Sequence, residues 1–390
     1  MDNKVYVIKC PDYAQAGEKV HELLDMMGGM NGFVEPGEKI VLKVNLLRKA
    51  PPDEAVSTHP AVVAEVARMT KAAGGKALIA DSPGAGFRFT EKVLQGIYEE
   101  TGMVQAAKDS GAELNSDFTF EPVSFSEGDL VKRFEVISAV LKADGVLNLC
   151  KLKTHSFMLM TGAVKNNFGV IPGLSKPGYH AKLMDTGRFA GMLLDLSRLV
   201  APRLSIMDAV VGMEGDGPGT GDPRRIGLLL GSTSPLALDV VAGEIIGLPR
   251  EKNPILLEAE KRGLSPCRLG EVALVGGDLD ALRIPDYKFP PTIYTGTGMA
   301  GHLTWWQKLM APLFKDGLTL KPHVSKKKCV ACAACYEACP MGAITMEKGH
   351  EKAYARIDDD KCIRCYCCHE MCAEEAIRLK GSFMYRLMNA

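Results

Sequence analysis

Two copies of one cysteine spacing near the C-terminal end of the 390-residue chain restrict its fold and chemistry more than any other feature. Each copy reads C-x2-C-x2-C-x3-C, and the second starts 33 residues after the first. Three thiolates on one tight loop can bind three irons of a cubane, while the fourth iron needs a more distant ligand. Zinc closes at four ligands and disulfides need no such repeat, so the spacing favours iron and sulfide. The repeat predicts two 4Fe-4S clusters held by Cys329, Cys332, Cys335, Cys339, Cys362, Cys365, Cys368 and Cys372.

Residues 320 to 381 resemble the bacterial two-cluster ferredoxins, a small α+β fold with the order βαββαβ. The repeat extends beyond the ligands, since Ala343 matches Ala376. The resemblance implies that each half lends one cysteine to the cluster of the other half. The register leaves Cys367 as a small buried neighbour of a ligand, and Ala373 stands where the family usually has proline. The implied ligand sets are Cys329, Cys332, Cys335 and Cys372 for one cluster, and Cys362, Cys365, Cys368 and Cys339 for the other.

The charge balance and the apolar runs narrow the classes of partner. The 47 basic and 47 acidic side chains give a formal charge of +0, so no global field attracts the chain to nucleic acid or to an anionic membrane. No apolar run reaches the roughly 18 residues of a membrane span, and the first residues do not read as a signal peptide. The clustering of the cysteines indicates metal binding in a reducing compartment. We therefore expect a cytoplasmic protein with a redox partner, a ferredoxin or a reductase, and no nucleic acid.

The first 280 residues alternate short β-branched runs with helical patterns, which predicts an α/β domain with a largely parallel sheet. The predicted strands cover residues 5–9, 40–44, 77–80, 145–149, 204–210, 226–230 and 272–275. The clearest helical periodicities cover residues 60–73, 91–110, 188–200 and 236–246. The predicted domain bounds are 1–280 for the α/β domain, 281–322 for a connector, 323–381 for the ferredoxin-like domain and 382–390 for a tail.

The connector contains both tryptophans of the chain, Trp305 and Trp306. We expect this pair to pack the ferredoxin-like domain onto the α/β domain, because two adjacent indoles left in water would form an exposed apolar patch. A G-x-G-x-x-G sequence also occurs here, at Gly296, Gly298 and Gly301. A proline pair precedes it and no βαβ unit follows, so it does not predict nicotinamide binding.

Polar side chains gather where the predicted strands end. In open α/β sheets, ligands bind outside the carboxyl ends of the strands, so we expect one edge of the sheet to be a binding face. The residues predicted to bind substrate are Lys43, Asn45, His59, Asp81, Lys151, Lys153, Lys165, Asn166, Asn167 and Asp208. The residues predicted to transfer protons or to act in catalysis are His155, His180, Glu214 and Asp216.

Several longer motifs resemble those of an uncharacterised iron-sulfur family, the domain of unknown function 362. They are KVNLL from Lys43, THP from Thr58, DSPG from Asp81, NLCKLKTH ending at His155, TGAVKNNFG from Thr161 and MEGDGP from Met213. The resemblance covers most of residues 36 to 250, and members often carry a ferredoxin tail. The family name implies no reaction, so the function has to be argued from the site.

The candidate residues fit two kinds of site. Their lysines and histidines favour a site for a small anion such as a carboxylate or a phosphate. The alternative is a mononuclear metal or another small cofactor held by the histidines and carboxylates, but no H-E-x-x-H spacing supports it. The glycine loop after Glu214 lacks the Gly-Lys-Ser/Thr of a phosphate-binding loop, so we expect Glu214 and Asp216 to be bases or cation ligands. His180 is predicted to lie on a loop, as a general acid or as a solvated residue.

Two functions follow from these features. In the first, the chain is a ferredoxin-linked oxidoreductase whose clusters carry electrons to or from an anionic substrate or cofactor at the strand ends. In the second, the chain is a non-enzymatic electron carrier, or a protein that binds a cofactor or a partner through its α/β domain.

Overall fold

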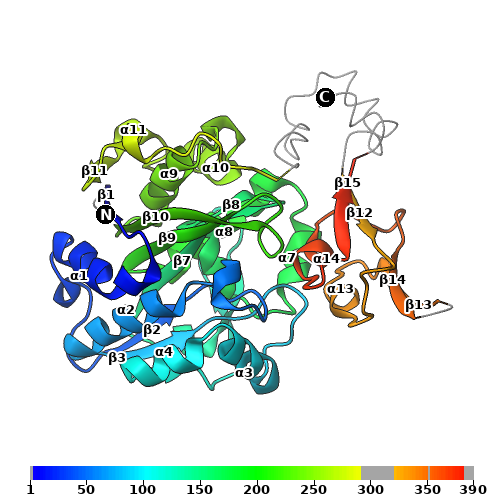
Figure 1. The fold of residues 1–390 in the computed structure, drawn as a ribbon, viewed down its shortest axis with the longest axis horizontal. Helices are drawn as coiled ribbons and strands as arrows, with labels where there is room; N and C mark the ends of the chain where they lie inside the picture. Colours follow the sequence, from blue (N-terminus) through cyan, green and yellow to red (C-terminus); the bar gives the residue numbers. More distant parts are fainter. Residues whose placement is uncertain (1–2, 291–319, 350–351, 382–390) are drawn as a thin grey trace.

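The structure is a computed structural model that describes residues 3–290, 320–349 and 352–381. Figure 1 shows a large α/β body formed by residues up to 290 and a smaller cysteine-rich body formed by residues from 320 onward. Trp305, Trp306, the G-x-G-x-x-G sequence and the predicted tail lie outside the described residues, and the domain bounds remain a prediction. Over the described ranges, no helix is long and apolar enough to cross a membrane.

A nine-stranded sheet runs through the α/β body in the order β11-β1-β10-β9-β7-β2-β3-β4, with β8 paired to β7. Five strand pairs are parallel: β1 with β11, β2 with β3, β2 with β7, β3 with β4 and β7 with β9. The pairs of β10 with β1 and β9, and of β8 with β7, are antiparallel. The predicted α/β domain with a largely parallel sheet is therefore confirmed. The strands are β1 (Lys4–Lys9), β2 (Lys39–Lys43), β3 (Lys76–Ala80), β4 (Glu113–Leu114), β7 (Gly145–His155), β8 (Leu159–Thr161), β9 (Leu204–Glu214), β10 (Asp222–Ser232) and β11 (Ala273–Val275), with a separate hairpin of β5 (Phe120–Ser124) and β6 (Arg133–Ile137).

The helices begin at residues that satisfy the free N–H groups of a first turn. The Asp185 side chain accepts from the Arg188 N–H at the start of α8, and α2 begins at Pro60, as the sequence predicted. The predicted helix over 91–110 is two helices, because Gly102 has a φ of 75° and turns the chain between them. The helices of this body are α1 (Ala16–Met26), α2 (Pro60–Ala72), α3 (Glu91–Glu100), α4 (Met103–Ser110), α5 (Ser138–Leu141), α6 (Ala163–Asn166), α7 (Lys176–Lys182), α8 (Thr186–Val200), α9 (Pro235–Ile245), α10 (Pro254–Lys261) and α11 (Leu279–Leu282).

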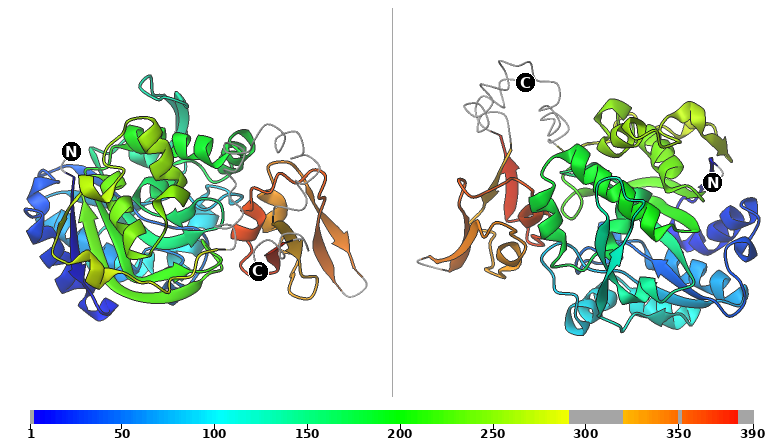
Figure 2. Two further views of the ribbon diagram at one scale, coloured as in Figure 1. Left: turned by 90° about the horizontal axis from the view of Figure 1, so that it is seen from above. Right: turned by 180° about the vertical axis from the view of Figure 1, so that it is seen from behind.

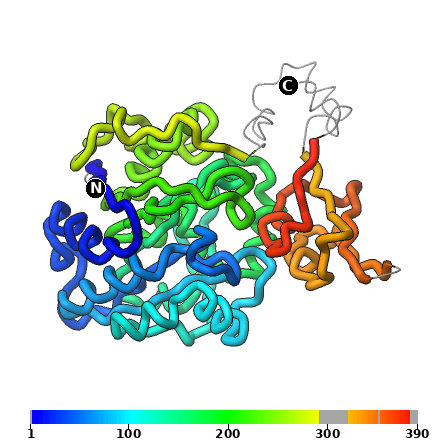
Figure 3. The backbone as a smooth tube through the Cα atoms, in the orientation of Figure 1, coloured from blue at the N-terminus to red at the C-terminus, as the bar shows by residue number. Residues whose placement is uncertain are grey.

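Both faces of the sheet are buried. Ile40 and Leu42 of β2 pack into the main core with α2, while Val41 between them packs into a separate cluster with Ala139 of α5. Alternate residues of a strand point to opposite faces, so this division places helices on both sides of the sheet. The tube drawing in Figure 3 shows the blue and cyan chain of α1 to α4 on one side of the body and the yellow-green chain of α9 to α11 on another.

Two central strands are longer than the sequence predicted. β7 continues to His155 because β8 folds back on it, with Lys153 opposite Thr161. Lys153 and His155 therefore lie inside a strand and not after it. β9 likewise continues to Glu214, paired with β10.

The cysteine-rich body has the predicted βαββαβ order. β12 (Lys321–Val324) pairs with β15 (Ile377–Lys380), β13 (Ile344–Lys348) pairs with β14 (Ala353–Ile357), and the short helices are α13 (Ala334–Glu337) and α14 (Cys367–Glu370). Both views in Figure 2 show this body against one end of the α/β body, with the red segment of α14 at the contact. Ala338 and Met371 are buried here against Ala85, and a Cβ on Gly86 would lie 2.4 Å from the Ala338 Cβ, so the two bodies meet closely.

Candidate functional site

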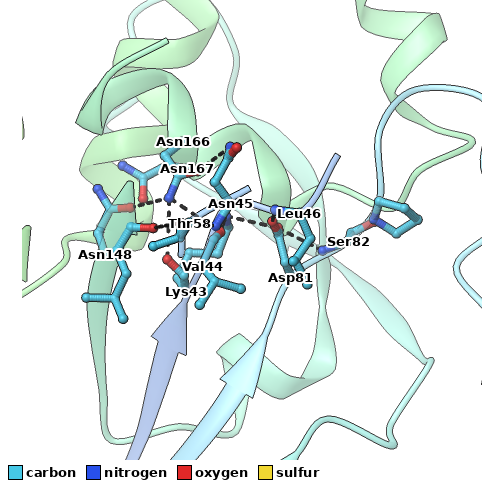
Figure 4. Close-up of polar contacts among 12 residues, drawn as sticks. Lys43, Val44, Asn45, Leu46, Thr58, Asp81, Ser82, Asn148, Asn166 and Asn167 are labelled. Carbon is cyan, nitrogen blue, oxygen red and sulfur yellow. Dashed lines mark hydrogen bonds and ion pairs between the residues drawn. The ribbon is translucent and has the colours of Figure 1, made fainter. Parts of the chain in front are cut away.

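The order of the strands reverses at β2, and this reversal opens a crevice. β2 and β7 are neighbours in the sheet. The chain continues from β2 to β3 on one side and from β7 toward β9 on the other, so the connections after these two strands run in opposite directions. Ligands of open α/β sheets bind at the carboxyl ends of strands at such a switch point. Asn45 follows β2, Ser82 follows β3 and His155 ends β7, so all three lie at this place. Figure 4 shows the arrows of two neighbouring strands pointing toward Asn45 and Asp81.

A pocket occupies the crevice. The centre of a water molecule can reach ≈ 60 Å³ of it, which leaves room for several waters or for a small anion. Its lining includes seven of the predicted site residues: Asn45, Asp81, Lys153, His155, Lys165, Asn166 and His180. It also includes four polar residues that the sequence did not single out as site residues: Ser82, Thr161, Lys176 and Glu370.

Three lysines line the pocket: Lys153, Lys165 and Lys176. Lys153 Nζ donates to the Val56 carbonyl at 2.7 Å, and Lys176 Nζ donates to the Ser82 carbonyl at 3.0 Å. Lys165 keeps some solvent-exposed surface, although its ammonium group lies deep among protein atoms. Within the described ranges, none of the three forms an ion pair. Burial lowers the pKa of Lys153 and Lys165, and it lowers the pKa of Lys176 to about 7.

Two histidines complete this wall. His155 Nδ1 accepts from the Phe157 N–H at 3.0 Å, so its other nitrogen carries the proton in the neutral ring. The His180 ring stacks on Phe189 at 4.5 Å, and its Nδ1 has no hydrogen-bond partner in the described structure. Burial lowers the pKa of His155 far below its usual value and that of His180 to about 3. His180 lies in α7, and the prediction of a loop there was wrong, because Lys176 to Lys182 close helical turns despite Pro177 and Gly178.

Lys43 differs from these lysines because it has its own counter-ion. Its Nζ lies 2.9 Å from Asp81 Oδ1, and both side chains are buried. Asp81 also accepts from the Leu46 N–H at 2.7 Å, so it joins the segments after β2 and β3. A Cβ on Gly169 would lie 2.0 Å from Asp81 Oδ1, and this explains the glycine that ends the TGAVKNNFG motif. Lys43 does not line the pocket.

His59, Lys151 and Asp208 form a different cluster, and the structure does not bring them to the pocket. Lys151 Nζ lies 2.8 Å from Asp208 Oδ2 and 2.8 Å from the Tyr13 hydroxyl, with both charges buried. The Tyr13 ring stacks on His59 at 3.4 Å. Burial lowers the pKa of His59 to about 4, against the opposing effect of Asp208.

The other predicted residues also lie outside the pocket lining. Glu214 ends β9 and lies 3.9 Å from Arg224. Asp216 faces the cysteine-rich body, where its Oδ1 lies 3.1 Å from His369 Nε2. Asn167 is buried and donates to the Ala163 carbonyl at 3.3 Å.

The cysteines gather around two voids in the cysteine-rich body. One void is lined by Cys329, Cys332, Cys335 and Cys372, and the other by Cys339, Cys362, Cys365 and Cys368. These are the sets that the ferredoxin resemblance implied, and they fit two clusters with exchanged fourth ligands. Residues on either side of each middle cysteine adopt left-handed φ angles, 57° and 63° at Ala331 and Ala333, and 59° and 63° at Arg364 and Tyr366. This conformation is costly for a residue with a side chain, and its recurrence 33 positions later shows that both loops are bent in the same way.

The second cysteine set lies beside the pocket. Cys368 and Glu370 belong to the same short helix, α14, and two residues span at most about 7 Å. Cys368 lines the second void, whereas Glu370 lines the pocket with one carboxylate oxygen 3.4 Å from His155 Nε2. Cys367 is fully buried against the α/β body and does not line the void. Sequence reasoning missed Glu370 because its motif belongs to the other domain, and only the contact between the bodies reveals it.

The described part of the structure contains no set of ligands for an additional metal ion. Apart from the two cysteine sets, no group of three or more histidine, cysteine or acidic side chains in residues 3–290, 320–349 and 352–381 is arranged to hold a metal ion. Nor does any described residue belong to a disulfide, since all twelve cysteines are free. The extra metal or small cofactor stays a prediction.

A doubly wound α/β body and a βαββαβ body with duplicated cysteine loops define an iron-sulfur protein of the ferredoxin-domain class. The model of the 4Fe-4S dicluster domain matches residues 328–376. The chain belongs to the family described as domain of unknown function (DUF362), whose model matches residues 40–244.

A curated protein and a solved structure are among the proteins to which the chain is similar. The thylakoid-associated protein sll1697 of Synechocystis is 38% identical over 249 residues, which is 63% of this chain and 74% of that protein. The lactate racemase apoprotein of Thermoanaerobacterium thermosaccharolyticum, a solved structure, matches with a TM-score of 0.37 and 12% identity. That match covers 61% of this chain and 56% of the racemase.

Proposed function

We propose that the chain is a redox protein that binds a small anion in the pocket and exchanges electrons with it through two 4Fe-4S clusters in the cysteine-rich body. The observation that carries this proposal is α14, which supplies a cysteine to the second set and Glu370 to the pocket. Separate functions for the two bodies would not require a shared helix.

The charge of the pocket supports an anionic ligand. In the described parts of the chain, Lys153, Lys165 and Lys176 form no ion pair, and only Asp81 and Glu370 of the pocket lining act on them from further away. An anion that displaces water from the pocket gains charge-assisted hydrogen bonds, which are about twice as strong as neutral ones. The same burial stabilises the neutral amines when no anion is present.

The roles of the protein groups follow from their positions. Lys153 and Lys165 hold the negative group, and Ser82 and Thr161 offer hydroxyls without partners to its remaining atoms. His155 presents its Nε2–H between the pocket and Glu370. When bound, the clusters supply one-electron transfer. The packing of α14 on the α/β body keeps water out of the space between the second cysteine set and the pocket.

The direct test uses the full chain with iron and sulfide reconstituted under argon. The protein is reduced with dithionite, and its visible absorbance is followed while small carboxylates and oxyanions are added one at a time. We expect one class of anion to reoxidise the protein faster than buffer does, and Lys165→Met to abolish that effect. Lys182→Met is the matched control, since Lys182 is also a lysine near the pocket, on α7, but does not line it. A protein that exchanges electrons with a reduced ferredoxin but responds to no anion is a carrier, and the proposal is then wrong.

The ligand sets have their own test. Cys368→Ser removes a residue that lines the second void, so we expect the iron content to fall from about eight to about four atoms per chain. Cys367→Ser is the neighbouring control and should leave the iron content unchanged. Iron analysis and the visible absorbance measure both variants. Full iron content in Cys368→Ser would contradict the assigned register.

A further inference from the structure

Three buried asparagines form a chain of amides whose orientation is fixed from one end. Asn148 Nδ2 donates to the Ala163 carbonyl at 3.0 Å, and this oxygen can only accept. Asn148 Oδ1 therefore accepts from Asn166 Nδ2 at 2.7 Å, and Asn166 Oδ1 accepts from Asn45 Nδ2 at 2.9 Å. Asn166 Nδ2 also faces the Lys43 carbonyl at 3.3 Å, which excludes the flipped amide. Figure 4 shows this chain of contacts from Asn148 through Asn166 to Asn45.

The orientation of the amides leaves an accepting oxygen at the pocket. Asn45 lines the pocket, and its Oδ1 is buried without a hydrogen-bond partner in the described structure. The ammonium groups of the pocket lysines are donors, but in the described structure none of them forms a hydrogen bond with Asn45 Oδ1. The amide cannot turn to offer its nitrogen, because Asn166 Oδ1 already holds that nitrogen.

A second unpartnered acceptor comes from the other body. Glu370 Oε1 lines the same pocket and receives no hydrogen bond from any described residue, although His155 Nε2 lies 3.4 Å away. Asn45 Oδ1 can only accept a hydrogen bond, and Glu370 Oε1 accepts one when its carboxyl group is ionised. Neither oxygen is aligned with a donor from a described residue. A buried acceptor without a donor is unfavourable, so a ligand that supplies a donor gains affinity over one that does not.

We propose that the ligand of the pocket is a small anion that carries an O–H or N–H donor beside its negative group. Lys153 and Lys165 hold the negative group, and Asn45 Oδ1 and Glu370 Oε1 accept from the donor. This inference rests on the proposed function, because it assumes that the pocket binds an anion. It excludes simple anions without a donor as the preferred ligands, since these would leave both oxygens unpaired.

Acetate and glycolate test this preference, because each has one negative charge and they differ by a single hydroxyl. Their affinities are measured by calorimetry at neutral pH on the full chain with its iron content verified. We expect the native protein to bind glycolate about five- to tenfold more tightly than acetate, as one additional hydrogen bond allows. Asn45→Leu and Glu370→Met each remove an acceptor and should lower this ratio toward one. Glu370→Gln keeps an accepting oxygen and should preserve a preference for glycolate.

The ratio of the glycolate affinity to the acetate affinity is compared within each variant. A general loosening of the pocket would weaken the binding of both ligands and leave this ratio unchanged, whereas the loss of a specific acceptor would change it. Equal binding of acetate and glycolate by the native protein would overturn this inference and leave the anion pocket intact, since water then satisfies the two oxygens. A ratio that both acceptor variants retain would also overturn it. If neither anion binds, the proposed function fails, and the inference fails with it.

Discussion

Two groups of lysines with deeply placed ammonium groups occur in the α/β body, and they differ in whether the protein supplies a counter-ion. Lys43, Lys151 and Lys153 lie on the sheet, whereas Lys165 lies on α6 and Lys176 on α7. Lys43 and Lys151 lie 2.9 Å and 2.8 Å from the aspartates Asp81 and Asp208. Lys153, Lys165 and Lys176 have no such partner among the described residues and line the pocket. A buried charge needs a partner, so the first group is complete by itself, whereas burial favours the neutral amines of the second group until an anion binds. Position at a strand end alone therefore does not identify a binding lysine.

Removal of a protein counter-ion should have the largest effect. Asp208→Asn keeps the shape of the side chain but leaves the Lys151 ammonium buried without a negative partner. We expect the free energy of unfolding to fall by about 3–5 kcal/mol, measured by urea denaturation. The double variant Lys151→Met/Asp208→Leu removes both charges and should recover part of the loss, because the His59 N–H and the Tyr13 hydroxyl, which also donate to Asp208, lose their acceptor. A loss below about 1 kcal/mol in Asp208→Asn would mean that this pair does not differ from the pocket lysines.

The fold was easier to predict from the sequence than the division between these lysines. Strand and helix periodicity is local, and the cysteine spacing carries its own chemistry, so both bodies could be identified. Lys151 and Lys153 are two residues apart and look equivalent in the sequence. Only the pairing of β7 with β9, which places Asp208 opposite Lys151, separates their roles.

The contribution of the second body could not be predicted for a similar reason. Glu370 lies in a cysteine motif and reaches the pocket only because α14 packs on the segment around Ala85. Lys176 was missed because its helix contains a proline and a glycine, which read as a loop. Contacts between segments distant in sequence have no local pattern that reports them.

Removal of an unpaired lysine should affect binding and not stability. Lys153→Met deletes a buried amino group whose hydrogen-bond partner in the described structure is the Val56 carbonyl, so we expect the free energy of unfolding to stay the same or to rise by about 1 kcal/mol. The affinity for a small anion should fall about 30-fold, since a charge-assisted hydrogen bond is lost. Calorimetry and urea denaturation on the same sample measure the two quantities. Lys43→Met is the contrasting control, because it leaves Asp81 unpaired and should destabilise the protein.

Lys176, the third lysine of the pocket, allows the paired and unpaired lysines to be compared through the pH dependence of anion binding. Burial lowers the pKa of Lys176 to about 7, with Lys43 and Lys165 adding to the effect and Asp81 opposing it. The protonated form attracts an anion, so the affinity should fall as pH rises above about 7, by up to about tenfold per pH unit. In the absence of ligand, the free energy of unfolding changes with pH in the opposite direction to the anion affinity. Between about 7 and the usual lysine pKa, the unfolded chain holds a proton that the folded chain lacks, so this residue makes stability rise with pH.

Calorimetric titrations from pH 6 to pH 9 measure this dependence, and Lys176→Met provides the reference. The variant should bind the anion more weakly at pH 6 and should lack the additional decline above pH 7. An identical pH dependence in both proteins would show that Lys176 is not the titrating group. Lys176 would then resemble Lys43 and Lys151, whose charges do not depend on the ligand.

The smallest effect is expected where a neutral group only supports a complete ion pair. The Tyr13 hydroxyl lies 2.8 Å from Lys151 Nζ and donates to Asp208 Oδ1 at 3.0 Å. Tyr13→Phe removes these bonds but keeps the ring that stacks on His59, and Lys151 and Asp208 keep their own contact. We expect a loss of about 1 kcal/mol in the free energy of unfolding and no change in anion affinity. A loss above about 3 kcal/mol would mean that the Tyr13 hydroxyl, and not Asp208 alone, stabilises the buried Lys151 ammonium. Lys151 would then depend less on its aspartate than Lys43 depends on Asp81.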